Sequence, residues 1–505
     1  MFTTEPRGLL PPVWVSWGSN SLSRRARRAV RGAPARYSSR MSDPILSQVQ
    51  NWLREHESDL LRDYRRLLQF PSLEAEARPN APFGQANREA LDFMLALGKE
   101  WGMRTADGEG YYGYAEFGDG EKLIMSLGHL DVVPVGDGWK HDPFGAEIDG
   151  EYVYARGAVD DKGPTMASFY AMRALQAVVP EIGARMRSVF GCNEESGFAC
   201  IHKYVEREES PTFGVAPDSG WPLYHAEKGI ANLEIEVTPP TGDLELVSAR
   251  GGQRPNIVID HFECTLRVAP AIRAEVEGKL SEYWDQNISS KWHDDELHLV
   301  ARGKAAHGAW PFGGDSAATR MFRLLMDLAP VPQSKAYTEL MEMGHVSGVG
   351  LGIHGGDDVS KDLTCNLGIV ETQDGKLQML FNIRYPVTWT GALLEQKCRA
   401  FLGELSLRAD LRVTRDSKPL YFPLEHPLVQ TICEVYTAET GETKAPGTMG
   451  GGTYARAVPN TVSIGTGWEG DGNAHETDER LKIENLYKMS RIYAHIFYRL
   501  AQLEA

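Results

Sequence analysis

The sequence has few cysteines, and they do not form the pairs that a disulfide framework or a thiolate metal site needs. Six cysteines are scattered over 505 residues without a CxxC spacing. Isolated cysteines of this kind are typical of small buried residues in a reducing compartment. A metal bound by this chain would therefore be held by histidine, aspartate and glutamate.

Long apolar runs and an excess of positive charge are also absent. No run approaches the roughly 18 apolar residues of a membrane-spanning helix. The formal net charge of −16 argues against a nucleic-acid partner, because phosphate contacts need clustered Lys and Arg. A chain of 505 residues exceeds one ordinary core and predicts two or three domains. We therefore expect a cytoplasmic protein that binds neither membranes nor nucleic acids.

Residues 1–40 differ in composition from the rest of the chain. Eight arginines stand against a single acid, Glu5, among serine, proline and alanine. This composition is typical of a mitochondrial transit segment or of a disordered extension. A start at Met41 is a third interpretation. We favour disorder or the later start over mitochondrial targeting.

Apolar periodicity after residue 41 predicts an α/β fold. One helical pattern runs from Ser42 to Leu68, and strands then alternate with helices, which favours a mostly parallel sheet covered by helices. Residues 230–388 mix alternating strands with helices and are expected to form an inserted α+β domain. Residues 41–229 and 389–505 would then be two parts of one domain.

Four strands of the predicted sheet run into acidic or imidazole side chains. A fifth group, Asp160 and Asp161, is delivered by a loop to the start of a helix. Ligands bind beyond the carboxyl ends of the strands in open α/β sheets, so these side chains are expected to share one site. The residues at this edge are His129, Asp131, Asp160, Asp161, Glu194, Glu195, Asp218 and His475.

Each of these residues also has an ordinary structural explanation. Asp160 or Asp161 could only cap the helix. Glu194 and Glu195 could lie in a solvated turn, and Asp218 could be an ordinary turn residue. His475 could be a surface histidine. Five such coincidences at one edge of a sheet favour a shared site.

Two histidines and several carboxylates without sulfur suit two Zn²⁺ ions, or Mn²⁺ or Co²⁺, that share a bridging carboxylate. Such a pair lowers the pKa of bridging water and stabilises a tetrahedral intermediate. Glu194 and Glu195 can divide the roles of general base and ligand, because adjacent side chains at a strand end point in different directions. A histidine ligand usually donates its second N–H to a carboxylate, so Asp131 is expected to accept this proton from His129.

Five sequence blocks resemble the aminoacylase/carboxypeptidase-like dinuclear zinc peptidases. In order they are SLGHLDVVPVGDGW, YARGAVDDKGPT, GCNEES, APDSG and GKAAHGAWP. The chain is most similar to the branch of Xaa-His dipeptidases, the PepV-type and carnosinase-like enzymes, over essentially all of residues 41–505. This resemblance implies a zinc-bearing α/β domain with an inserted lid domain.

The resemblance also implies a role for each residue at the sheet edge. Asp131 would orient His129, and Glu194 would be the general base that activates the metal-bridging water. Asp161 stands where other branches carry methionine. The implied metal ligands are His129, Asp160 as the bridge, Glu195, Asp218 and His475.

Three residues of the lid resemble substrate contacts of the family. His307 matches a histidine that polarises the scissile carbonyl, Arg384 an arginine that binds the free carboxylate, and Asn256 a carbonyl contact. Without the resemblance they would be a surface histidine, a paired arginine and a turn residue. The glycine-rich loop with Gly451 and Gly452 could present N–H groups to an anion or be a flexible turn.

The resemblance predicts a metallo-dipeptidase that hydrolyses short peptides with a free C-terminal carboxylate. An amidohydrolase acting on N-acyl amino acids or succinylated diamines is the alternative, because it would share the metal core. A non-catalytic binding protein on the same fold is a further alternative. The partner is then a small peptide. The long lid, which could supply His307 within one chain, favours a monomer over a homodimer.

Overall fold

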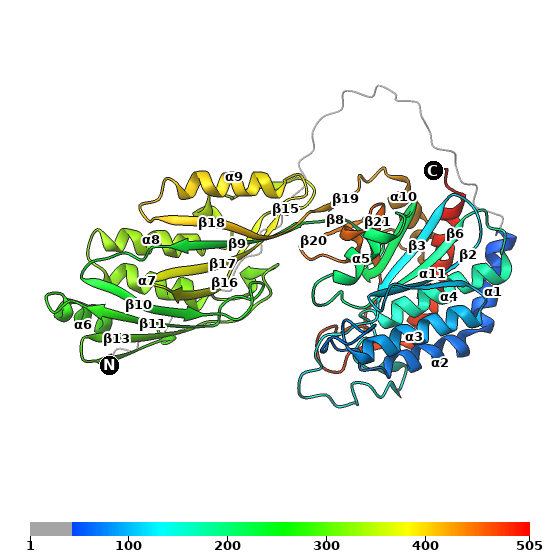
Figure 1. Cartoon of the computed structure of the whole chain (residues 1–505), viewed down its shortest axis with the longest axis horizontal. Helices are drawn as coiled ribbons and strands as arrows, with labels where there is room; N and C mark the ends of the chain where they lie inside the picture. Colours follow the sequence, from blue (N-terminus) through cyan, green and yellow to red (C-terminus); the bar gives the residue numbers. More distant parts are fainter. Residues whose placement is uncertain (1–42, 505) are drawn as a thin grey trace, which may run out of the picture. The chain divides into compact units, whose positions relative to one another are not determined.

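The computed structural model describes residues 43–504, so the predictions for residues 1–40 lie outside the described part. Apolar side chains between Pro44 and Ala505 form two hydrophobic cores. The second core runs from Ala231 to Leu411, and the first core uses residues on both sides of it in the sequence. One region is therefore inserted into the other (Figure 1). We call residues 229–417 the inserted region and the rest of the described chain the main region.

The main region is built on a nine-stranded sheet with the path β1-β2-β6-β3-β7-β21-β8-β19, in which β20 pairs with β8. Its central strands β6, β3, β7 and β21 are parallel, and the edges are antiparallel. These four strands are the ones predicted to end in site residues. The bounds are β1 Arg104–Asp107, β2 Tyr112–Phe117, β3 Leu123–His129, β6 Arg185–Gly191, β7 Phe213–Ser219, β8 Leu223–Glu227, β19 Leu420–Tyr421, β20 Gly447–Met449 and β21 Thr461–Gly465.

Helices cover this sheet, and α4 and α11 pack against each other and against β3. The helical pattern predicted from Ser42 to Leu68 is divided into two helices at His56. A separate three-stranded sheet consists of β4 (Glu147–Asp149), β5 (Tyr152–Tyr154) and β22 (Arg480–Lys482). The helices are α1 Pro44–Glu55, α2 Glu57–Leu68, α3 Gln85–Glu100, α4 Lys162–Val178, α5 Ala199–Arg207, α10 Pro427–Thr440, α11 Ile483–Gln502 and the 3₁₀ turn η3 Tyr454–Ala457.

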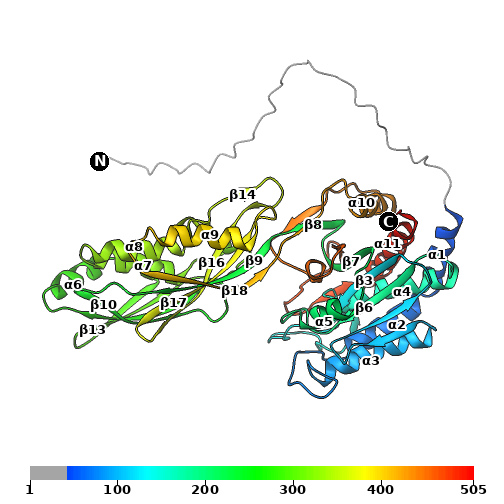
Figure 2. The same cartoon turned by 45° about the horizontal axis from the view of Figure 1, so that its top comes forward.

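The inserted region is an eight-stranded antiparallel sheet with the path β12-β13-β11-β10-β16-β17-β9-β18. Its helices α7, α8 and α9 lie on one side of the sheet (Figure 2). The bounds are β9 Gly229–Val237, β10 Leu244–Gly251, β11 His261–Val268, α6 Arg273–Glu282, β12 Ile288–His293, β13 Glu296–Arg302, η1 Pro311–Gly313, α7 Ala317–Leu328, α8 Gln333–Met343, η2 Val349–Leu351, β14 Gly356–Asp357, β15 Lys361–Asp362, β16 Thr364–Gln373, β17 Lys376–Tyr385, α9 Gly391–Leu402 and β18 Ala409–Ser417.

The predicted boundary at residue 388 falls inside the inserted region. Leu394 and Cys398 of α9 are buried in the second core, and β18 pairs with β9. The predicted fold class, α/β with an inserted α+β domain, is confirmed. The sheet predicted to be mostly parallel is parallel at its centre and antiparallel towards both edges.

Strand β9 shows how the second sheet separates its two faces. Its odd-numbered residues Ala231, Leu233, Ile235 and Val237 are buried in the second core. Side chains alternate along a strand, so the even-numbered residues 230–236 lie on the opposite face. That face carries polar groups.

All six cysteines are free thiols, five of them buried, as predicted. Among residues 43–504, no helix combines the length and the apolar character that crossing a membrane requires.

Candidate active site

His129 is the last residue of β3, a strand in which every residue is buried. The strand pairs with β6 and β7 on either side, which explains its continuous apolar run. Gly128 allows α4 to approach closely, because a Cβ there would lie 1.9 Å from Oγ1 of Thr165. Asp161 then accepts the backbone N–H of His129 at 3.1 Å and the Thr165 hydroxyl at 2.9 Å. Its carboxylate holds the end of β3 and does not cap the helix backbone.

The His129 ring is oriented by the backbone of Asp131. Its Nδ1 lies 2.9 Å from the Asp131 carbonyl oxygen and 3.6 Å from the Asp131 carboxylate. The predicted hydrogen bond to the carboxylate is therefore wrong. That carboxylate instead accepts the N–H groups of Glu194 and Glu195, both at 3.0 Å. The parallel register of β3 and β6 pairs His129 with Gly191, and this pairing brings the turn after β6 to Asp131.

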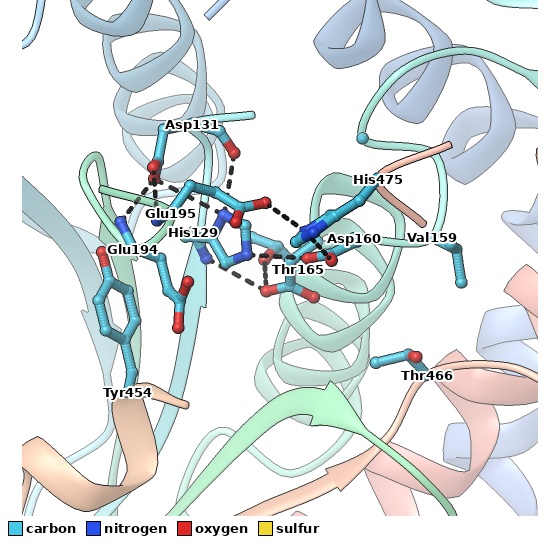
Figure 3. Close-up of polar contacts among 12 residues, drawn as sticks. His129, Asp131, Val159, Asp160, Thr165, Glu194, Glu195, Tyr454, Thr466 and His475 are labelled. Atoms are coloured by element: carbon cyan, nitrogen blue, oxygen red, sulfur yellow. Dashed lines mark hydrogen bonds and ion pairs between the residues drawn. The ribbon is translucent and has the colours of Figure 1, made fainter. Parts of the chain in front are cut away.

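Asp160 lies between two histidines that are far apart in the sequence. Its Oδ1 is 3.1 Å from Nε2 of His129, and its Oδ2 is 3.1 Å from Nε2 of His475 (Figure 3). Each carboxylate oxygen thus faces one imidazole. A carboxylate that bridges two metal ions, each with its own histidine, requires this arrangement.

Glu194 and Glu195 point to different parts of the cluster (Figure 3). Oε1 of Glu195 is 3.0 Å from Nε2 of His475. Ligand atoms of His129, Asp160 and Glu195 lie within 4.8 Å of one another, as do those of a second group. The second group is His129, Glu194 and Asp218.

Carboxylates outnumber cationic groups in this cluster. Among residues 43–504, none of its six carboxylates pairs with a lysine or arginine, and the ion pairs that Asp131, Asp160 and Glu195 form are with His129 and His475. Burial and the neighbouring acids raise the pKa of Asp218 and of Glu194 well above the usual value. Burial also disfavours the ionised form of Asp160, but its two histidine partners lower its pKa overall. Because buried uncompensated charge is costly, this donor set fits divalent cations.

The loop that carries His475 is tied to the Asp160 loop by Glu479, a residue that the sequence did not reveal. Its buried carboxylate accepts N–H groups of Gly157, Val159 and Asp160 at 2.9–3.2 Å and a guanidinium N–H of Arg156 at 2.8 Å. Arg156 and Glu479 are 323 positions apart, so no local pattern pairs them.

One cavity of about 650 Å³ joins this cluster to the inserted region. Except for His129, Asp131 and Asp161, which are buried, every residue predicted for the site lines it. On the main-region side these are Asp160, Glu194, Glu195, Asp218, His475, Gly451 and Gly452, and on the other side Asn256, His307 and Arg384.

His307 and Asn256 lie on two adjoining loops. The Gly308 N–H donates to the Asn256 carbonyl oxygen at 2.7 Å. Nδ1 of His307 accepts the N–H of Ala309 at 3.2 Å, which places the proton of the neutral ring on Nε2. Burial and the charge of Arg384 lower the pKa of His307 and favour this neutral form. Nε2 is then available as a donor.

Arg384 lies in β17 with 5% of its surface exposed. Its Nε donates to Oδ1 of Asn382 and its Nη1 to the Gly450 carbonyl oxygen, both at 2.9 Å. No carboxylate lies within 4.0 Å of it among the described residues. The glycine-rich loop therefore presents a carbonyl oxygen to Arg384, and the next carbonyl, of Gly451, accepts from Arg456 at 3.1 Å.

Comparisons with known proteins identify the family of the chain. The model of "Peptidase family M20/M25/M40" matches residues 125–499. "Putative dipeptidase YtjP" of Bacillus subtilis (strain 168) is 34% identical over 470 residues, 90% of this chain and 100% of the relative. A "Putative dipeptidase" of Staphylococcus epidermidis is 33% identical over 464 residues, 88% of this chain and 98% of the relative. The crystal structure of human carnosine dipeptidase 1 has a similar fold, with a TM-score of 0.55 at 16% identity over 91% of this chain and 99% of that one.

Proposed function

Since the chain belongs to peptidase family M20/M25/M40, we propose that it is a dipeptidase with two divalent metal ions that cleaves short peptides with a free C-terminal carboxylate. Family membership makes it a hydrolase of peptide bonds and confirms the resemblance found in the sequence blocks. The names of the curated relatives support the dipeptidase assignment. The observation that carries the proposal is Asp160, whose two oxygens each face a histidine at 3.1 Å.

Five side chains would hold the two ions, with Asp160 between them. Nitrogen and oxygen donors without sulfur suit Zn²⁺, and they also suit Mn²⁺ or Co²⁺. When bound, the ions supply Lewis acidity, which polarises a carbonyl and lowers the pKa of water. The proposed ligands are His129, Asp160, Glu195, Asp218 and His475.

Glu194 is the proposed general base. Its N–H is held by the Asp131 carboxylate at 3.0 Å, and its own carboxylate faces His129 and Asp218. Burial raises its pKa, which suits a carboxylate that takes a proton from water and passes it to the leaving amine. Asp131 acts on the reaction through the backbone positions that it fixes.

The inserted region would bind the substrate. Nε2–H of His307 would donate to the oxygen of the scissile carbonyl, where negative charge develops. Asn256, on the adjoining loop, would contact a substrate carbonyl. The guanidinium of Arg384, which has no acidic partner among the described residues, would bind the free C-terminal carboxylate. This last contact would limit substrates to peptides whose C-terminus lies close to the cleaved bond.

Metal content and substrate range together test the proposal. We expect chelation to abolish hydrolysis of Ala-Ala and about two equivalents of Zn²⁺, Mn²⁺ or Co²⁺ to restore it. N-acetyl-alanine, tested in parallel, should be cleaved at least about 100-fold more slowly. If N-acyl amino acids were cleaved efficiently and dipeptides were not, the protein would instead be an amidohydrolase.

A further inference from the structure

A row of side chains on the face opposite the second core lines the same cavity as the acidic cluster. Three neighbouring strands, β18, β9 and β17, present it in register. One cross-strand row is Arg415, Asn232 and Asn382, and the next is Ser417, Ile230 and Arg384. The two arginines therefore lie on one face, with the single strand β9 between them and an offset of two residues along it.

Neutral amides lie between the two arginines on this sheet face. Nε of Arg384 donates to Oδ1 of Asn382 at 2.9 Å, and Nδ2 of Asn382 donates to Oδ1 of Asn232 at 2.8 Å. Asn232 is the direct cross-strand neighbour of Arg415. These bonds orient Arg384 without neutralising either guanidinium.

Arg415 has no acidic partner among the described residues, in contrast to Arg412 and Arg456. Arg412, also on β18, lies opposite Glu234 and forms an ion pair with it at 2.6 Å. Arg456 pairs with buried Glu227 at 3.1 Å. Among residues 43–504, no carboxylate oxygen lies within 4.0 Å of Arg415 or Arg384. Arg384 and Arg415 are thus two of three guanidinium groups without an acidic partner among the described residues that line this cavity; the third, Arg254, comes from another loop and not from this sheet face.

The two positive charges are close enough to affect each other. Burial, together with the charges of Arg456 and Arg415, lowers the pKa of Arg384 to about 10. A single C-terminal carboxylate, bound by Arg384, would neutralise only one of the two guanidinium groups on this sheet face. The other would remain a binding site for a second anionic group of the same ligand.

We propose that Arg415 binds the side-chain carboxylate of a C-terminal aspartate or glutamate, which makes peptides with an acidic C-terminal residue the preferred substrates. This inference rests on the proposed dipeptidase function. Strand spacing and rise separate the two arginine Cα atoms by about 12 Å. Two converging arginine side chains and the two carboxylates of one terminal glutamate can span that distance.

The test compares Ala-Glu with the nearly isosteric, neutral Ala-Gln. We expect the wild-type protein to show a kcat/KM for Ala-Glu about tenfold above that for Ala-Gln. R415Q should reduce this ratio to about one, and R415E should bring it below one. R412Q is the control. Arg412 lies on the same strand but outside the cavity, so its replacement should leave the ratio unchanged. Thermal unfolding of each variant checks that it is folded.

Four results would overturn the inference. A wild-type ratio near one, or a ratio unchanged in R415Q, would leave Arg415 as a solvated surface cation while the dipeptidase assignment stands. Loss of the preference in R254Q instead of R415Q would move the anion contact to Arg254, which lines the cavity from another loop. Failure to cleave Ala-Gln, Ala-Ala and Ala-Glu alike would remove the dipeptidase function and this inference with it.

Discussion

The two sides of the cavity differ in charge and in the way the fold supplies their side chains. The main region contributes carboxylates from the carboxyl ends of parallel strands and from the loops that follow them, as at Asp218 and Glu194. The inserted region contributes Arg384 and Arg415 from one face of an antiparallel sheet. Loops at strand ends can bring together residues from distant segments, whereas a sheet face fixes side chains at regular spacings.

This difference suggests that the two sides of the cavity have different functions. A converging set of acids and histidines suits metal ions and proton transfer, which affect kcat. A regularly spaced pair of guanidinium groups suits recognition of carboxylates, which affects KM. Variants of the acidic cluster should therefore change mainly kcat, and variants of the two arginines mainly KM. A variant with the opposite effect would contradict this assignment.

The largest effect is expected at Glu194. E194Q keeps the shape of the side chain but cannot accept a proton, so kcat for a dipeptide should fall by about 10³-fold or more. Metal content should stay near two ions per chain, as measured by elemental analysis of the purified protein.

E195Q is the matched control for this variant. Glu195 lies 3.0 Å from His475 and within reach of Asp160, so its replacement should lower metal content. Loss of metal in E194Q with retention in E195Q would mean that the roles of the two glutamates are exchanged.

His307 is expected to give the next largest effect and is the exception on the inserted side. H307A removes the donor to the developing oxyanion, so kcat should fall about 100-fold with metal content unchanged. H345A is the control, because Nδ1 of His345 also accepts the N–H two residues later, that of Ser347, yet His345 lies outside the cavity. Equal losses in both variants would point to a structural role.

A smaller, substrate-dependent effect is expected at Arg384. R384Q should raise KM for dipeptides about 10- to 100-fold, because a hydrogen bond to a charged group is lost. The C-terminal amides of the same dipeptides lack the charge and should show less than a threefold change. Steady-state kinetics on both series measures these changes in KM. Equal changes for dipeptides and amides would argue against a carboxylate contact.

The sequence predicted the elements whose pattern is local. The four parallel strands and helices α9 and α10 follow from continuous apolar runs or helical spacing. Strand β18 was missed because half-polar ADLRVTRDS gains its structure from pairing with β9, more than 170 residues earlier. The break between α1 and α2 at His56 was missed because apolar spacing continues across it.

The site shows the same limit. Residue types at strand ends predicted which acids and histidines would meet, and Asp160 does lie between His129 and His475. The hydrogen-bond partners could not be predicted in the same way. The Asp131 carboxylate turns from His129 to the N–H groups of Glu194 and Glu195, a choice that depends on how β6 lies beside β3.

The smallest effect on the reaction is expected at Glu479. Its carboxylate touches only the loop of Asp160 and Arg156, so it affects the reaction through the position of a metal ligand. In E479Q an NH₂ group would face donors of Arg156 or of the Asp160 loop, leaving buried groups unsatisfied. Metal affinity should fall about tenfold, as is typical when a residue that positions a ligand is changed. Titration with a competing chelator measures this, while KM for Ala-Ala at saturating metal should change little. E476Q, at an exposed position three residues earlier, should leave metal affinity unchanged. If E479Q bound metal as tightly as E476Q, the Asp160 loop would hold its place without this carboxylate.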